Sequence, residues 1–169
     1  MYQDQMTPVE RGKAIAAGQE VDRRPVGLIY GAAAHSLLGW TINREWQSGR
    51  NLAEVQKKVY QTLATDSLSA GHGLHGLALL YGAEADYPPH APLILTRHPL
   101  ADVHDYRRLS LERTEQDERA AKCLDCLEIL RDELGDTVGC GMSFAGAFTA
   151  ASGLVGPETL LCALIDDPE

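Results

Sequence analysis

Two histidines, His72 and His75, are the residues whose type and spacing most directly indicate chemistry. They are three positions apart, so on a helix they would share one face. An imidazole exchanges protons near neutral pH and can also bind a metal ion. We therefore expect them to be catalytic residues that contact a substrate or donate a proton to it. The alternative is structural, with one histidine capping the helix and the other packing.

Four further polar residues stand where a strand or a turn would present them. Tyr30 and His35 follow a short apolar run, and Ser143 and Thr149 flank a glycine-rich turn. Backbone N–H groups in such a turn can bind an anion or a cofactor tail. These four are the predicted substrate- or cofactor-binding residues. For the turn, the alternative is that its glycines only allow a strand and a helix to pack closely.

The cysteines carry a weaker signal. Cys123 and Cys126 have the spacing of metal ligands, but they fall inside a long amphipathic pattern where paired thiols usually fill space. Cys140 is expected to fill a small space in the core. All four cysteines of the chain are expected to be reduced thiols, and we predict no metal site in this part of the protein.

The elements that would position these residues alternate between helices and strands. Thr7 as N-cap, Pro8 at the first helical position and Glu10 at the third predict an opening helix over 8–17. Apolar spacing and short apolar runs predict the others. They are strands over 25–30, 66–71 and 137–144, and helices over 51–64 (with Asn51 as N-cap), 74–81, 103–109, 114–134 and 157–165.

Three details of this pattern can be tested directly. The proline-rich stretch 83–95 predicts an irregular excursion with edge-strand character. The Gly/Ala-rich stretch 146–153 predicts a connection. The long helix should bury a stripe that consists of Ala120, Leu124, Leu127, Leu130 and Leu134.

Strands that alternate with helices predict βαβ units, a parallel sheet and an α/β fold. Three strands are too few for a closed barrel, which needs eight strands and typically ~250 residues. The chain ends on Asp-Asp-Pro-Glu at 166–169 within or just after a helix, so we expect 1–169 to be a single incomplete domain cut from a larger protein.

Charge and hydropathy exclude two classes of partner. A net charge of -9 and a pI near 5.1 leave no basic surface for a nucleic acid. No signal peptide is visible, and no apolar run approaches the ~20 residues of a spanning helix. We therefore predict a cytoplasmic protein that has no membrane or nucleic-acid partner.

Three groups of segments resemble the uroporphyrinogen decarboxylase (URO-D) superfamily, in order and over nearly the whole chain. They are similar to its opening helix and the entry to its first strand, to a helix end, and to its glycine-rich loop with the helix that follows. The segments are 6–11 with 22–26, 79–84 with 87–88, and 148–151 with 156–158 and 166–169. The resemblance implies the N-terminal half of a (β/α)8 TIM barrel, whose active site lies at the carboxyl ends of the strands.

The superfamily contains both decarboxylases and corrinoid-dependent methyltransferases, so the fold alone does not decide the function. By resemblance, a decarboxylase carries two arginines near 30–35, an aspartate near 72–76 and a tyrosine near Gly153, and this sequence has none of them there. We therefore expect a methyltransferase or demethylase that moves a methyl group between a small methylated substrate or a thiol and a cobalamin-binding protein. The corrinoid would come with that partner or as a substrate. A zinc ion, if required, would be held by residues of the C-terminal half.

Two alternatives remain: a divergent uroporphyrinogen decarboxylase, and a non-catalytic half-barrel that acts as an interaction module. An open sheet also exposes unpaired strand edges, a liability that association relieves. We therefore expect a homo-oligomer or pairing with a missing C-terminal half, and this chain alone would be inactive.

Overall fold

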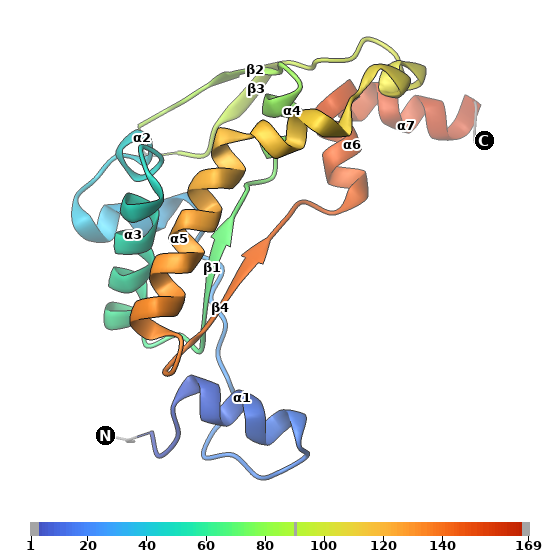
Figure 1. Ribbon diagram of the computed structural model, residues 1–169. Coiled ribbons are helices and arrows are strands. Elements are labelled where there is room, and N and C mark those ends of the chain that lie inside the picture. The colour runs from blue at the N-terminus through green and yellow to red at the C-terminus, as the bar shows by residue number, and fades with distance from the viewer. Residues whose placement is uncertain (1–3, 90, 167–169) are drawn as a thin grey trace. The chain divides into compact units, whose positions relative to one another are not determined.

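The computed structural model describes residues 4–89 and 91–166 of the 169-residue chain (Figure 1). These residues form two compact units. The first unit comprises Met1–Ala70 and Lys122–Met142, and the second comprises Gly71–Ala121 and Ser143–Glu169. The boundaries fall at the carboxyl ends of two strands, so each strand contributes its last residue to the second unit.

The first unit consists of helices on a small parallel sheet. Strand β1 (Ser67–Gly71) pairs with β4 (Gly139–Ser143), and both run in the same direction (Figure 1). Five helices complete the unit: α1 (Pro8–Ala16), the 3₁₀ helix η1 (Gly31–Leu38), α2 (Ile42–Glu45), α3 (Gly49–Leu63) and most of α5 (Glu118–Leu134). The fold is therefore α/β, with helices flanking parallel strands.

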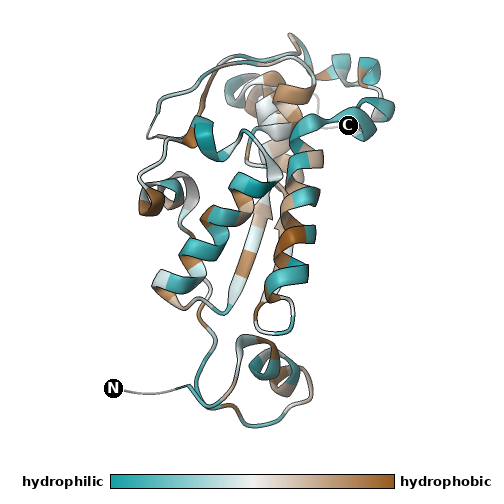
Figure 2. Ribbon diagram, turned by 60° about the vertical axis from the view of Figure 1, so that its left-hand side comes forward, coloured by the Kyte–Doolittle hydropathy of each residue, from teal (hydrophilic) through white to brown (hydrophobic). Residues whose placement is uncertain are grey.

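The core of this unit lies where α3 and α5 meet the sheet. Its buried residues come from η1, from both helices, from β1 and from the position just before β4. They are Ala34, Leu52, Ala53, Val55, Val59, Leu68, Ala70, Cys123, Cys126, Leu130 and Val138. Hydrophilic and hydrophobic residues alternate around α3 and α5 in Figure 2, as expected for helices with one buried face.

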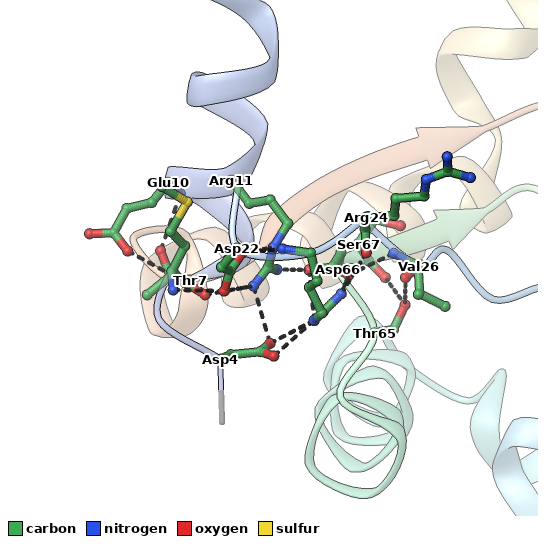
Figure 3. A network of polar contacts seen from close by, with 12 residues as sticks. Asp4, Thr7, Glu10, Arg11, Asp22, Arg24, Val26, Thr65, Asp66 and Ser67 are labelled. Atoms are coloured by element: carbon green, nitrogen blue, oxygen red, sulfur yellow. Dashed lines mark hydrogen bonds and ion pairs between the residues drawn. The ribbon is translucent and has the colours of Figure 1, made fainter. Parts of the chain in front are cut away.

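A network of charged side chains ties α1 to the start of β1 (Figure 3). Arg11 is 1% exposed, and its guanidinium donates to Asp22, Asp66, Asp4 and the Met6 carbonyl. Arg23 donates to Asp4 and Asp66 from the other side. A buried charge is tolerated only when it is paired in this way.

The second unit is built from short elements. Its helices are α4 (Gly76–Leu80), η2 (Val103–Arg108), η3 (Leu111–Gln116), α6 (Ala147–Val155) and α7 (Pro157–Asp166). Strands β2 (Glu84–Asp86) and β3 (Ile94–Arg97) pair antiparallel, with Ala85 opposite Leu95 and Asp86 opposite Ile94. This pair confirms the edge-strand character that was expected for 83–95.

Several expected elements are confirmed. The capping box of Thr7 and Glu10 begins α1, and Thr7 and Glu10 donate and accept reciprocally at 2.8 and 3.2 Å. Helices α3, α5 and α7 and strands β1 and β4 lie within two to four residues of their expected bounds.

The segment 25–30 is not the doubly buried strand that its apolar run predicts. Only its first residues bond to the start of β1, where the Val26 carbonyl accepts from the Asp66 N–H and the Thr65 hydroxyl. Val26 is 48% exposed and Ile29 fully exposed, so the described residues form no ladder and no covering layer along it. The prediction was wrong because an apolar run does not reveal whether a neighbour covers it.

Three boundaries also differ from expectation. Ser48, not Asn51, is the N-cap of α3, and its hydroxyl accepts from the Asn51 N–H at 3.1 Å. The long helix begins at Glu118 rather than at 114, after the separate turn η3. The stretch 146–153 is not a connection, because Gly146 is the N-cap of helix α6 and the rest of the stretch lies within that helix.

Among the described residues, no single helix is long and apolar enough to cross a membrane. Helices α6 and α7 pass together on length and composition, but they are bent by 107° at the break between them.

Candidate functional site

A constellation of polar residues in the second unit centres on His72, directly after the last residue of β1. Its Nε2 lies 2.5 Å from Oδ2 of Asp117, and the two side chains are 11% and 10% exposed. Asp117 lies immediately before α5. The structure thus places an imidazole and a carboxylate, which are 45 residues apart in the sequence, in direct contact.

The backbone of His72 is held on both sides. Its N–H donates to the Ser143 carbonyl at 3.2 Å, and its carbonyl accepts from Nε of Arg119 at 3.0 Å. Asp117 is held too, because its Oδ1 accepts from the Arg119 N–H at 2.9 Å and so caps α5. The ring and its carboxylate partner are therefore fixed before any ligand arrives.

A glycine and an aromatic ring lie beside the imidazole. A Cβ atom at Gly76 would lie 2.2 Å from Nδ1 of His72, so only glycine leaves room for the ring. The Phe144 ring lies 6.3 Å from the His72 ring, centroid to centroid, and is 68% exposed. An exposed aromatic ring beside a held histidine provides an apolar surface for a ligand.

Gly76 gives a direct test of this geometry. Gly76→Ala would normally stabilise a helix by about 1 kcal/mol. Here we expect it to lower stability and to displace the imidazole from Asp117, because the new methyl group would overlap Nδ1. Thermal unfolding compared with Gly139→Ala, where a Cβ meets nothing within 4 Å, measures the difference. An unchanged or higher midpoint for Gly76→Ala would contradict the packing described here.

His75 does not share a helix face with His72. It is the N-cap residue of α4, whereas His72 lies in the preceding loop, so the two rings have different surroundings. Nδ1 of His75 is buried, and no partner for it is found in the described part of the chain. Burial, with a smaller contribution from His98, lowers the pKa of His75. The helix-face prediction was wrong because both histidines precede Gly76, the first residue of the helix.

The glycine-rich segment gives more support to packing than to anion binding. Gly153 of α6 faces α4, where a Cβ would lie 3.3 Å from that of Ala78. Its carbonyl lies 2.8 Å from Nδ1 of His98. Ser143 is exposed and contributes its carbonyl to His72, and Thr149 is half-buried within α6. Ser143 therefore adjoins the constellation, while the ligand-binding roles of both residues stay predictions.

Tyr30 and His35 lie in the first unit. The Tyr30 hydroxyl donates to Oε1 of Gln56 in α3, and burial raises the pKa of this phenol. His35 is 1% exposed, and its Nδ1 lies 3.5 Å from Oε2 of Glu45. Both side chains thus contact neighbouring helices, and their predicted contact with a substrate or cofactor stays a prediction.

The thiols of α5 pack in the core, as their place in an amphipathic pattern predicts. Cys123 and Cys126 are fully buried in α5, and burial raises the pKa of Cys126 to about 12. Such a thiol stays protonated and is a poor metal ligand. Within residues 4–89 and 91–166, no three His, Cys, Asp or Glu side chains are grouped to hold a metal ion.

Comparison with known sequences and structures identifies the family. The profile described as uroporphyrinogen decarboxylase (URO-D) matches residues 7–169. The chain belongs to the URO-D family. No curated protein matches the sequence.

One solved structure gives the fold of this URO-D chain. It is described as a methyltransferase from Methanosarcina mazei, and it superposes with a TM-score of 0.79 at 19% sequence identity over 97% of this chain. The URO-D chain described here spans 50% of that structure's chain. The fold of the URO-D chain described here therefore matches half of a TIM barrel, as the resemblance implied.

Sequence reasoning about this URO-D protein missed Asp117 and Arg119. The local signal was an aspartate followed by Glu118 at a helix start. That signal was overlooked because the helix was expected to begin earlier, at 114, which would have placed Asp117 inside it on the solvated face.

Proposed function

We propose that this URO-D chain forms part of a corrinoid-dependent methyltransferase or demethylase. The observation that carries the proposal concerns residues 30–35. By resemblance, a decarboxylase of the family has two arginines in this segment. Here the segment enters the 3₁₀ helix η1, contains no arginine, and points its buried His35 at the carboxylate of Glu45. An acidic partner opposes, rather than assists, the binding of a substrate with many carboxylates.

The His72–Asp117 pair supplies the chemistry that methyl transfer requires of a side chain. When a methyl group leaves an oxygen or nitrogen atom, that atom must take up a proton, and a thiol acceptor must lose one. An imidazole held by a carboxylate can do either. The corrinoid, brought by a cobalamin-binding protein or as a free substrate, accepts or donates the methyl group. The small methylated substrate would lie over the exposed ring of Phe144.

Zinc does not fit the residues described here. Their His, Cys and carboxylate side chains form no group of three that could bind it, and burial raises the pKa of the Cys126 thiol to about 12, so that this thiol stays protonated. Zinc therefore enters no step assigned to this chain, and residues outside it would have to hold the ion.

The proposal includes a cytoplasmic location and either self-association or pairing with a C-terminal half.

A second function is favoured by one observation. Asp117 brings a carboxylate to the loop after β1, close to the place where family decarboxylases have their aspartate. A divergent decarboxylase that uses Asp117 in this way is the second candidate.

Two assays on the purified complete protein, of which this chain is proposed to form a part, separate the candidates. In the first, methylcobalamin with a thiol, and reduced cobalamin with methanol, methylamine or a methoxyaromatic compound, are followed by the visible spectrum of the corrinoid. In the second, uroporphyrinogen is followed by chromatography of its products. We expect spectral change that depends on the protein and no loss of carboxyl groups. Decarboxylation of uroporphyrinogen, or no methyl transfer with any of these donors and acceptors, would overturn the proposal.

A further inference from the structure

We propose that Asp117 is the positioning residue of His72, and that it leaves Nδ1 as the atom that exchanges a proton with the ligand. The proton-exchange part of this inference rests on the proposed function. The positioning part stands on the geometry of the free protein and can be tested without any substrate.

The contact with Asp117 selects one tautomer of the ring. A neutral imidazole has one N–H group, and an ionised carboxylate can only accept a hydrogen bond. Nε2 lies 2.5 Å from Oδ2 of Asp117, so Nε2 carries the hydrogen and Nδ1 carries the lone pair. A carboxylate that orients a histidine in this way also stabilises its protonated form without taking the proton itself.

Asp117 is itself held by the helix that it begins. One carboxylate oxygen caps α5 through the Arg119 N–H at 2.9 Å, which turns the other oxygen toward His72. The Arg119 side chain closes the arrangement by donating to the His72 carbonyl at 3.0 Å. The side chain of His72 and the carbonyl of His72 therefore both bind the first turn of one helix, and the ring needs no reorganisation before it reacts.

Nδ1 is the nitrogen that remains for chemistry. It lies against Gly76, where a side chain is excluded, and in the described part of the chain it has no hydrogen-bond partner. When His72 is protonated, Nδ1–H can donate its proton to the oxygen or nitrogen atom that the methyl group leaves. The imidazole then becomes neutral, and the charge of Asp117 does not change. In the opposite direction, Nδ1 takes the proton from a thiol acceptor.

Asp117→Asn tests the positioning role because it inverts the hydrogen bond while keeping the helix cap. Asparagine caps helices about as well as aspartate. Its oxygen is needed by the Arg119 N–H, so its NH₂ group faces Nε2 and can only donate. The ring should therefore change from the Nε2–H to the Nδ1–H tautomer. Nitrogen-15 NMR of histidine-labelled protein measures this change, with the His72 signals assigned from His72→Gln.

The matched control is Asp102→Asn. Asp102 also caps a helix in the second unit, through the His104 N–H at 2.8 Å, but no imidazole nitrogen of residues 4–89 or 91–166 is bonded to it. We expect no change in the His72 tautomer or in the rate of methyl transfer for this variant. For Asp117→Asn we expect the tautomer to change and the rate to fall by about 10²- to 10⁴-fold, with a urea midpoint close to that of the unsubstituted chain.

The outcomes separate the two inferences. A His72 tautomer that is the same in both proteins would overturn the positioning role of Asp117, whatever the assays of methyl transfer give. A changed tautomer with an unchanged rate would overturn proton exchange at Nδ1. A changed tautomer in a protein that shows no methyl transfer at all would leave Asp117 as the positioning residue and overturn the proposed function alone.

Discussion

Replacing Arg11 by methionine is expected to lower the free energy of unfolding by about 3–5 kcal/mol. Methionine fills a similar volume but cannot donate to the carboxylates that surround this position. Asp22 and Asp66 have side chains only 2% and 5% exposed, and they would lose the guanidinium that pairs with both. Removing one partner of a buried ion pair leaves an uncompensated charge, which is why the loss exceeds the value of the bond.

Lys13→Met is the matched control for this measurement. Lys13 lies on the same helix, two residues away, and it is exposed, so the change removes the same charge without opening the network. Equilibrium unfolding in urea, followed by circular dichroism, should give a change within about 0.5 kcal/mol for Lys13→Met. Similar losses for the two variants would contradict a specific role of the Arg11 network.

The network also predicts how stability depends on pH. The hydrogen bond from Arg11 holds the pKa of Asp22 well below its usual range. Burial alone would raise the pKa of Asp66, but hydrogen bonds from Arg23 and the Val26 N–H outweigh it, so that pKa is also lowered. Carboxylates with lowered pKa stabilise the fold above the usual aspartate pKa, and this contribution is lost as the pH falls through their folded values. The difference between the unsubstituted chain and Arg11→Met should therefore be largest above the usual aspartate pKa of 3.8 and narrow as the pH falls below it.

Local signals in the sequence predicted the elements that depend on neighbouring residues alone. The capping box of Thr7 and Glu10 fixes the start of α1 by hydrogen bonds across three residues, and such a signal is complete within the sequence. Strand β1 and helix α3 were predicted for the same reason, because their apolar spacing matches the period of the element that they form.

The candidate site was predicted only in part, because its decisive contact is not local. His72 was selected for its type and position, but the partner that orients it lies 45 residues further along, and nothing in the sequence near either residue indicates the other. His75 shows the opposite error. Its spacing from His72 was read as helical, but the helix begins only at Gly76, so both histidines lie before it and their rings share no helix face.

The same distinction explains one misplaced residue in the buried stripe that was expected for α5. Leu130 is fully buried as expected, and Leu127 and Leu134 are partly buried against the core, but Leu124 is 59% exposed. Cys123 and Cys126 are fully buried instead, at the same three- and four-residue spacing. The thiols fit because α3 approaches closely at Gly49, where a Cβ would lie 2.9 Å from the Cys126 backbone nitrogen. Small side chains are needed at such a crossing.

Leu130→Ala and Leu124→Ala turn that correction into a measurement. Both variants make the same change on the same helix, so helix propensity and the unfolded chain contribute equally, and the difference between them reports burial alone. Leu130 is fully buried in the core, and its truncation should cost about 2–5 kcal/mol of unfolding free energy. Leu124→Ala should cost less than about 1 kcal/mol.

The result for Leu124 also bears on association. Leu124 lines an open hollow of about 500 Å³ on the first unit, together with Leu127, Val138 and Cys140. If the hollow faces water, the losses of unfolding free energy for Leu130→Ala and Leu124→Ala differ as stated above at every protein concentration. If a second copy of the chain covers it, Leu124→Ala should become costly, and the cost should rise with protein concentration because association stabilises the folded state by mass action. Urea unfolding of both variants at two concentrations tenfold apart therefore decides whether this hollow faces water or is covered by a second copy of the chain.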